Sequence, residues 1–332
     1  MSTIQIALAS DEKFAQHLAV TLASILLHAA PDDRLAFCVI DGGITPESKE
    51  KLEELRSIKD FDLTFLTPDW SLLEGCPEVL HLTKNTYLRL LIPKLLPEIP
   101  KILYLDCDIV VTTSLHDLWN IDMEGKSIAC AMDNPEQFWR TLAPETDGVK
   151  KRLNIKNTPF NAGVLLMDLE KVRRQESFDK TIRWLETHPK LLHAGDQDGL
   201  NVIFNDDYKL LPQCWNIQIF QGMNQYYDLT RLVRSFYRKD ENGREAGGII
   251  HFITAIKPWH PEFSDPVGDL YFSHLVRTAW RDWKVKRTLI QKILYPVRRT
   301  WLFRQFRLLI FRHTLTRNLT LLFFRTFFPQ KK

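Results

Sequence analysis

The 332-residue sequence lacks the features that mark several specialised classes of protein. Its five cysteines are odd in number and scattered without a CxxC pair, which argues against a disulfide framework or a zinc knuckle and favours a reducing compartment. No uncharged apolar run reaches about 18 residues, and the chain does not open on a basic stretch followed by an apolar one. We therefore expect neither a transmembrane helix nor a signal peptide. No segment has a disordered composition, so a globular protein is expected.

Acidic residues are scarce in the C-terminal part of the chain. Residues 1–262 hold 29 Lys and Arg against 38 Asp and Glu, whereas residues 263–332 hold 15 against three. Arginines alternate there with large apolar and aromatic side chains, which suits the interface of an anionic bilayer. We expect a membrane-association segment; a packed helical subdomain is the plainer alternative. A nucleic-acid patch is disfavoured because the apolar content exceeds what phosphate contacts need.

Short β-rich runs alternate with segments of helical period, which is typical of a parallel sheet with right-handed crossovers. Strands are expected at 4–10, 34–43, 61–66, 101–111, 127–133, 161–169 and 248–254. Helices are expected at 18–26, 46–58, 85–96, 178–185 and 195–204. Repeats and low-complexity linkers are absent from the sequence. We therefore predict one α/β domain at 1–262, followed by the basic segment at 263–332.

The run "YLDCDIVV" (104–111) places two carboxylates inside an expected buried strand, where an unpaired carboxylate costs several kcal/mol. Residues i and i+2 of a strand point to the same face, so Asp106 and Asp108 would project together, away from Cys107. Two oxygen ligands at this spacing suit a hard divalent cation such as Mg²⁺ or Mn²⁺, which would offset the buried charge. A pair of solvated carboxylates at a strand end is the plainer interpretation.

Two reactions could use this doublet. In a phosphohydrolase of the haloacid-dehalogenase type, Asp106 would be the nucleophile. Alternatively, the pair holds a metal that bridges the diphosphate of a nucleotide-sugar and acts as a Lewis acid. The phosphatase motif usually lies on the first strand and needs a later GDxxxD, but here Leu200 takes the place of that last aspartate. The phosphohydrolase becomes the minor alternative, beside a non-catalytic module that binds UDP-sugar or glycan.

Six motifs resemble glycosyltransferase family 8 in order and spacing, over about residues 4–262: "ASDEKF", "TYLRL", "YLDCDIVV", "FNAGVLLMDL", "GDQDGLN" and "HFITAIKPWH". This family includes bacterial lipopolysaccharide galactosyl- and glucosyltransferases. The resemblance implies a GT-A catalytic domain with a central mixed, mostly parallel sheet, which uses a UDP-hexose and Mn²⁺ (or Mg²⁺) and retains anomeric configuration. It also implies a lipid-linked or lipopolysaccharide glycan as acceptor, and a location on the cytoplasmic face of the inner membrane.

The resemblance assigns roles to individual residues. Asp106, Asp108 and His251 would be the metal ligands, and Lys257 would offset the charge of the diphosphate. The expected donor-binding residues are Asp11 for uracil, Phe14 where the family typically has tyrosine, Arg89 for the donor sugar and the diphosphate, Asn161 and Asp196 for sugar hydroxyls, and Gly163 for close backbone approach. Cys107 and Thr254 complete this set. Thr254 replaces a glycine common in the family, and its β-branched side chain restricts the turn.

Asp196 and Gln197 are the expected catalytic pair, and Asp133 is expected to border the acceptor. Gln197 matches the residue on the β-face of the reacting sugar. Retention normally suggests a covalent carboxylate intermediate. An amide is a poor nucleophile, so attack by the acceptor on the same face is the alternative, and the sequence leaves the two mechanisms open.

Overall fold

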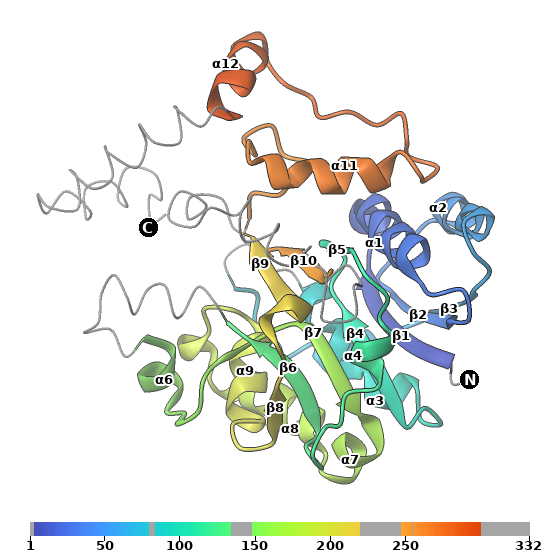
Figure 1. Ribbon diagram of the computed structural model, residues 1–332. Helices are drawn as coiled ribbons and strands as arrows, with labels where there is room; N and C mark the ends of the chain where they lie inside the picture. The colour runs from blue at the N-terminus through green and yellow to red at the C-terminus, as the bar shows by residue number, and fades with distance from the viewer. Residues whose placement is uncertain (1–2, 80–83, 134–147, 220–246, 254, 300–332) are drawn as a thin grey trace, which may run out of the picture.

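A computed structural model describes residues 3–79, 84–133, 148–219, 247–253 and 255–299. Its centre is a seven-stranded sheet of order β3-β2-β1-β4-β7-β6-β8 (Figure 1). The strands are β1 (Thr3–Ser10), β2 (Arg34–Asp41), β3 (Asp62–Leu66), β4 (Lys101–Leu105), β6 (Ile128–Met132), β7 (Phe160–Asp168) and β8 (Tyr208–Leu210). Only β7 runs antiparallel to its neighbours, β4 and β6. The predicted α/β fold with a mixed, mostly parallel sheet is confirmed.

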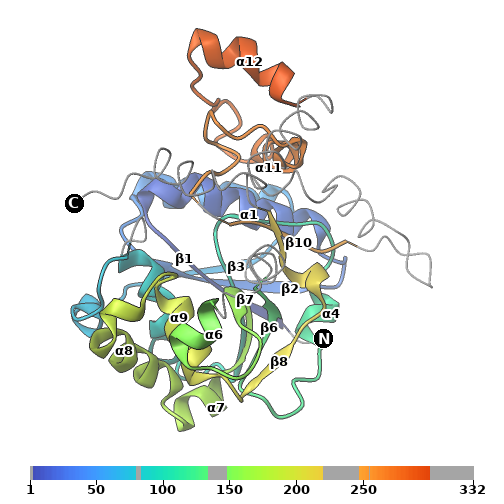
Figure 2. The same cartoon turned by 90° about the vertical axis from the view of Figure 1, so that its left-hand side faces the viewer.

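The α-helices of the described residues lie mostly on the two faces of this sheet. They are α1 (Ala15–His28), α2 (Pro46–Glu53), α3 (Ile92–Leu95), α4 (His116–Trp119), α6 (Gly148–Leu153), α7 (Leu169–Arg174), α8 (Ser177–Thr187), α9 (Asp196–Ile203), α11 (Asp269–Leu275) and α12 (Leu289–Arg299). Strand alternation separates two cores: Ile6 and Leu103 pack with α1, whereas their neighbours Ala7 and Tyr104 pack with α8 and α9. Figure 2 shows α1 on one face and α8 and α9 on the other.

Short 3-10 helices complete the chain: η1 (Glu12–Phe14), η2 (Glu54–Ser57), η3 (Trp70–Leu73), η4 (Lys84–Leu91), η5 (Pro189–Leu191), η6 (Gln213–Asn216) and η7 (Pro266–Gly268). The helix expected at 85–96 is mostly η4, and only its end forms α3. Pro93 lies in the first turn of α3, where its missing N–H needs no helical acceptor. The segment is therefore a 3-10 helix up to Leu91, and the α-helix begins only just before the proline.

The strand expected at 101–111 is in fact two strands, and that prediction was wrong. β4 ends at Leu105, and β5 (Ile109–Val111) belongs to a second sheet, of order β5-β10-β9, with β9 (Ile217–Ile219) and β10 (Ile249–Phe252). Residues 106–108 form the turn between the sheets, so strand alternation is not what brings the two aspartates together. The Thr21 hydroxyl of α1 lies 3.1 Å and 2.9 Å from the carbonyl oxygens of Cys107 and Ile109 and fixes this turn.

The first residues after 262 pack against the body of the protein. Phe263, Val267, Tyr271 and Leu275 share a third core with the three-stranded sheet and Val20 of α1. Helix α1 is buried on almost all sides because α11 covers its outer side, and α12 lies beyond α11, farther from the sheet (Figures 1 and 2). Residues 300–332, nearly half of the predicted membrane segment, lie outside the described residues.

Helix α12 exposes an apolar side. Leu289, Ile290 and Ile293 are 75%, 69% and 63% exposed. Each helix in the described part of the chain is too short or too polar to cross a bilayer.

Candidate active site

The three predicted metal ligands meet where the two sheets join. Asp106 and Asp108 come from the β4–β5 turn, and His251 comes from β10, which pairs with β5. His251 Nε2 lies 3.0 Å from Asp108 Oδ1 and 3.7 Å from Asp106 Oδ2. One ligand atom from each of the three residues lies within 4.8 Å of the others. This geometry can hold one cation.

The site fits a divalent metal ion by two independent observations. Asp108 Oδ1 is buried and makes no hydrogen bond among the described residues, although it faces His251 Nε2. Gly163 lies against the cluster, where an added Cβ would clash with His251 Cε1 and come within 2.7 Å of Asp106 Oδ2. A side chain at 163 would therefore fill the space beside the ligands. Two carboxylates and one imidazole form a donor set that Mn²⁺ accepts.

Lys257, the residue expected to offset the charge of the diphosphate, lies beside the cluster. Its Nζ donates to Asp108 Oδ2 at 2.6 Å and to the Phe252 carbonyl oxygen. Burial alone would raise the pKa of Asp108, but the Lys257 ammonium and His251 outweigh burial and hold this pKa below its usual range. The Asp108 carboxylate is thus ionised, and the Lys257 ammonium beside it could contact a diphosphate.

Arg89 bridges two of the predicted functional carboxylates. The guanidinium is buried, with Nη1 3.1 Å from Asp106 Oδ1 and Nε 2.8 Å from Asp196 Oδ2. It also donates to the Ala162 carbonyl oxygen at 2.6 Å. Burial raises the pKa of Asp196 to about 6, although Arg89 opposes this rise. Arg89 therefore positions Asp106 and Asp196.

The amide residues predicted to face the sugar form one hydrogen-bonded row. Asn161 Nδ2 donates to Gln197 Oε1 at 3.0 Å, and Gln197 Nε2 donates to Asp133 Oδ2 at 3.0 Å. Gln197 lies in the first turn of α9, next to Asp196. The structure thus brings together Asn161, Asp196, Gln197 and Asp133, which come from three different parts of the chain.

Sequence reasoning missed two residues that organise this region. Asn216, at the end of η6, lies 3.0 Å from His251 Nδ1 and 2.8 Å from Asn161 Oδ1. Arg152 of α6 pairs through both terminal nitrogens with Asp198, whose Oδ2 also accepts the backbone N–H groups of His193 and Ala194. Arg152 thereby fixes the start of α9. Neither residue has a local sequence signal, because their partners are distant along the chain.

Asp11 and Phe14 lie at the end of β1. Asp11 Oδ1 caps η1 by accepting the Phe14 N–H at 3.1 Å, and its Oδ2 accepts from Asn85 Nδ2 at 2.6 Å. Phe14 is 39% exposed and stands edge-on to His17 and Trp259, which stack with ring centroids 3.6 Å apart. Asp11 therefore caps the short helix that follows it.

Two predicted donor-binding residues remain, Cys107 and Thr254. The Cys107 thiol is buried and donates to the Ala9 carbonyl oxygen at 3.2 Å. Only the backbone of Cys107 would therefore be available to contact the sugar donor. Thr254 lies outside the described residues.

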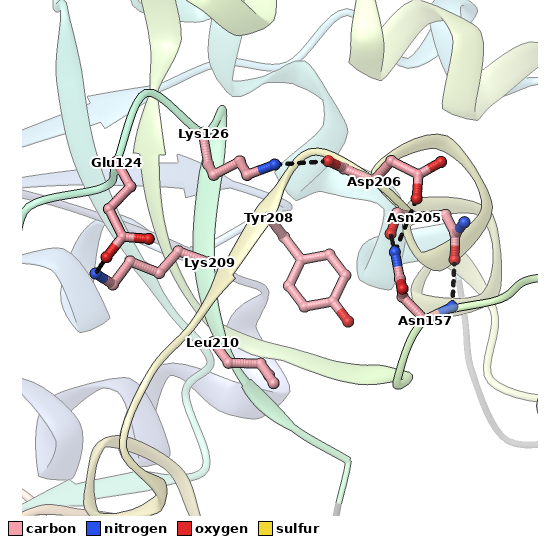
Figure 3. Close-up of a pocket in the computed structure, with 8 residues that line it drawn as sticks. All are labelled: Glu124, Lys126, Asn157, Asn205, Asp206, Tyr208, Lys209 and Leu210. Atoms are coloured by element: carbon pink, nitrogen blue, oxygen red, sulfur yellow. Dashed lines mark hydrogen bonds and ion pairs between the residues drawn. The ribbon is translucent and has the colours of Figure 1, made fainter.

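A surface pocket of about 460 Å³ lies elsewhere, beside edge strand β8 (Figure 3). Its walls carry paired side chains, such as Lys209 with Glu124 at 2.5 Å. The pocket adjoins the start of β6, whereas Asp133 follows the end of that strand. Its lining, drawn from the described residues, includes none of the predicted site residues. We do not assign it to the active site.

Comparison with known proteins agrees with this geometry. The sequence model of Glycosyl transferase family 8 matches residues 5–262. General stress protein A of Bacillus subtilis is 31% identical over 277 residues, which cover 82% of this chain and 92% of that protein. Lipopolysaccharide 1,3-galactosyltransferase of Salmonella typhimurium is 26% identical over 283 residues, covering 83% and 78%.

A solved structure shows the same fold. The galactosyltransferase LgtC, in complex with donor and acceptor sugar analogs, matches with a TM-score of 0.69 and 24% identity, over 84% of this chain and 99% of that chain. Because the family model spans most of the sequence and a curated relative exceeds 30% identity, the chain belongs to glycosyltransferase family 8 and is a hexosyltransferase with a GT-A fold.

Proposed function

We propose that this hexosyltransferase moves glucose or galactose from a UDP-sugar to a membrane-associated glycan, the lipopolysaccharide core, with Mn²⁺ (or Mg²⁺) and with retention of configuration. The observation that carries the proposal is the cluster of Asp106, Asp108 and His251 beside Lys257, next to the row of amides. The similarity to a lipopolysaccharide galactosyltransferase supports the choice of acceptor.

The charges in the site suit a diphosphate leaving group. A divalent cation held by Asp106, Asp108 and His251 would supply Lewis-acid stabilisation of the departing UDP. Lys257 adds a cation that the protein itself provides, held at the site by Asp108 Oδ2 and the Phe252 carbonyl oxygen. Arg89 keeps Asp106 and Asp196 in place from the buried side.

The hydrogen bonds of Gln197 support attack on the same face over a covalent intermediate. Gln197 Oε1 accepts from Asn161 Nδ2 and from the Ala162 N–H, so both of its lone pairs are engaged. In same-face attack the acceptor oxygen bonds to the anomeric carbon as the bond to the diphosphate breaks. The acceptor proton passes to a departing phosphate oxygen. Gln197 then acts as a fixed dipole beside the oxocarbenium-like sugar.

Helix α12 supports the proposed attachment to an anionic membrane on its cytoplasmic face. Its exposed Leu289, Ile290 and Ile293 lie close to the exposed cations Lys286 and Lys292. Apolar side chains that enter the acyl boundary and lysines that reach headgroups are the two elements of interfacial binding. This arrangement would hold the catalytic domain near a lipid-linked acceptor.

Thermal shift with UDP, UDP-glucose and UDP-galactose, each with and without Mn²⁺, tests the donor and metal together. At about a hundredfold excess of ligand over its Kd, binding adds about 2.7 kcal/mol to the free energy of unfolding. We expect this stabilisation only with Mn²⁺, and we expect Asp108→Asn to remove it. Asp117→Asn, at an exposed carboxylate of α4, is the matched control. No metal-dependent stabilisation by any UDP compound would contradict the proposal.

Activity assays separate the alternatives. Metal-dependent release of UDP from a UDP-hexose supports a transferase, and binding without any turnover supports a binding module. Release of phosphate from phosphomonoesters that Asp106→Asn abolishes supports the phosphohydrolase.

A further inference from the structure

We propose that Asn216 is a positioning residue that fixes the tautomer of His251 and joins the metal site to the amide row. This inference rests on the proposed function. Asn216 is fully buried at the end of η6, directly before β9, and β9 pairs with the strand that carries His251. Its backbone is therefore held by the same sheet as its histidine partner.

The orientation of each amide follows from two backbone donors. The Gly163 N–H donates to Asn161 at 3.0 Å, so the atom it meets must be Oδ1. Asn216 lies 2.8 Å from that same oxygen and must turn Nδ2 toward it. The Ala162 N–H meets Gln197 in the same way and defines its Oε1. Every amide in the row thus has one possible orientation.

The tautomer of His251 follows from the orientation of Asn216. With Nδ2 committed to Asn161, Asn216 turns its Oδ1 toward His251 Nδ1, 3.0 Å away. Nδ1 must then carry a hydrogen, so the lone pair of a neutral ring is on Nε2, the nitrogen that faces Asp108 Oδ1 and Asp106 Oδ2 where a cation would bind. An imidazole held in this way is ready to ligate a cation through Nε2.

The same amide reaches the sugar-binding side. From Asn216 the hydrogen bonds continue to Asn161, then to Gln197, and end at Asp133. His251 and Asp133 lie at opposite ends of this row, one beside the proposed metal and one beside the proposed acceptor. A substitution at Asn216 should therefore affect both His251 at the proposed metal and Asp133 at the proposed acceptor, although the buried Asn216 itself contacts neither substrate.

Two substitutions separate the two halves of this role. Asn216→Leu removes both hydrogen bonds and should weaken Mn²⁺ binding about 10-fold to 100-fold, as loss of a partner to a metal-bound histidine does. Asn216→Asp keeps an oxygen acceptor for His251 Nδ1 but presents a second oxygen to Asn161 Oδ1. It should therefore keep Mn²⁺ affinity while kcat falls at least about tenfold, since the Asn161–Gln197 pair loses its support.

Calorimetric titration with Mn²⁺ in the presence of UDP measures the affinity, and ¹⁵N chemical shifts of labelled histidine in the metal-free protein report the tautomer. Gln175→Leu, a half-buried amide near the start of β6, controls for the loss of an internal hydrogen bond. We expect that variant to keep Mn²⁺ affinity and kcat. Asn216→Leu should shift His251 toward a mixture of tautomers, whereas Asn216→Asp should preserve the Nδ1–H form.

Wild-type Mn²⁺ affinity and tautomer in Asn216→Leu would overturn the inference, and so would an unchanged kcat in Asn216→Asp. If the leucine variant does not fold, the aspartate variant alone decides, because a purely structural residue would not lower kcat while leaving metal affinity intact. Failure of wild-type protein to bind Mn²⁺ and UDP would instead count against the proposed function.

Discussion

The metal cluster and helix α12 both leave groups without partners, but of opposite kinds. In the cluster, the buried Asp108 Oδ1 makes no hydrogen bond among the described residues and lies 3.0 Å from His251 Nε2. On α12, Leu289, Ile290 and Ile293 are mostly exposed to water. A buried carboxylate oxygen of this kind would be stabilised by a cation, whereas an exposed apolar side would be stabilised by a surface that removes it from water. The comparison teaches that donor binding and membrane attachment should fail separately.

Helix α11 lies between these two regions and belongs with the body. Tyr271 is buried, its hydroxyl accepts from Gln16 Nε2 at 2.9 Å, and it lies 2.8 Å from His17 Nδ1. His17 stacks on Trp259, two residues after Lys257. The basic segment therefore begins with a part that supports the donor side, and only α12 presents an unpartnered apolar side among its described residues.

Truncation at residue 261 should give the largest effect, because it removes part of the third core together with α12. A chain that ends at Pro261 loses Phe263, Val267, Tyr271 and Leu275 from the third core. Each buried side chain contributes about 1.5–3 kcal/mol, and the sum approaches the whole stability of a typical domain, about 5–15 kcal/mol. We expect this chain not to fold, as judged by circular dichroism on heating.

A chain that ends at Lys284 keeps the third core, including Trp280 and Trp283, which pack against it. It should fold, bind UDP with Mn²⁺ and no longer pellet with anionic vesicles. If the chain that ends at Pro261 instead unfolded cooperatively at the wild-type temperature, α11 would be dispensable and the folded domain would end at about residue 262.

Gly163→Ala should break the metal side alone. The new Cβ would clash with His251 Cε1 and approach His251 Nδ1 within 2.8 Å, so the ring or the backbone must move. Displacing a functional group by about 1 Å can cost about 100-fold in rate. We expect a loss of that order in turnover, with weaker Mn²⁺-dependent UDP binding by calorimetry. Pelleting with vesicles should stay at the wild-type level, and a parallel loss of both would mean that the regions are coupled.

Ile290→Glu combined with Ile293→Glu should break the membrane side alone. Removing two exposed isoleucines from the interface should weaken partitioning into anionic vesicles at least about tenfold, which corresponds to about 1.4 kcal/mol. UDP affinity should not change. The pair Ile290→Ser and Ile293→Ser removes apolar surface without adding charge, and Gln291→Glu adds charge without removing apolar surface. Wild-type pelleting of both isoleucine variants would remove α12 from the proposed interface.

Replacing His17 should give the smallest effect at neutral pH and a larger one in acid. Burial lowers the pKa of His17 from about 6.5 to about 3. The unfolded chain therefore binds this proton first, so the stability that neutral His17 contributes is complete above pH 6.5 and is lost as the pH falls toward 3. The loss is about 1.4 kcal/mol per pH unit within that window.

His17→Phe should flatten this part of the pH dependence in urea denaturation between pH 7 and 5. At pH 7 it should lose only about 1 kcal/mol, for the hydrogen bond with Tyr271. Equal slopes for the wild type and the variant would show that His17 does not titrate with unfolding.

The sequence alone determined the fold class, because period-two apolar runs specify strands wherever one face is buried. The spacing of Asp106 and Asp108 suggested a cation site, and the resemblance to glycosyltransferase family 8 added His251 to it. The break between β4 and β5 depended instead on pairing of residues 109–111 with β10, about 140 residues later in the chain. Local strand propensity does not depend on β10, so the sequence around residues 101–111 could not predict this break.

Only the tertiary structure decided what Asn216, Arg89 and α11 do. An asparagine in "QCWNIQIF" has no signal of its own, and its partners His251 and Asn161 are 35 and 55 residues away. Likewise, the basic residues of the segment 263–332 begin only at Arg277, and the third core buries α11 and leaves α12 exposed. Composition specifies which side chains a segment carries, whereas burial and hydrogen-bond direction arise only when distant segments meet.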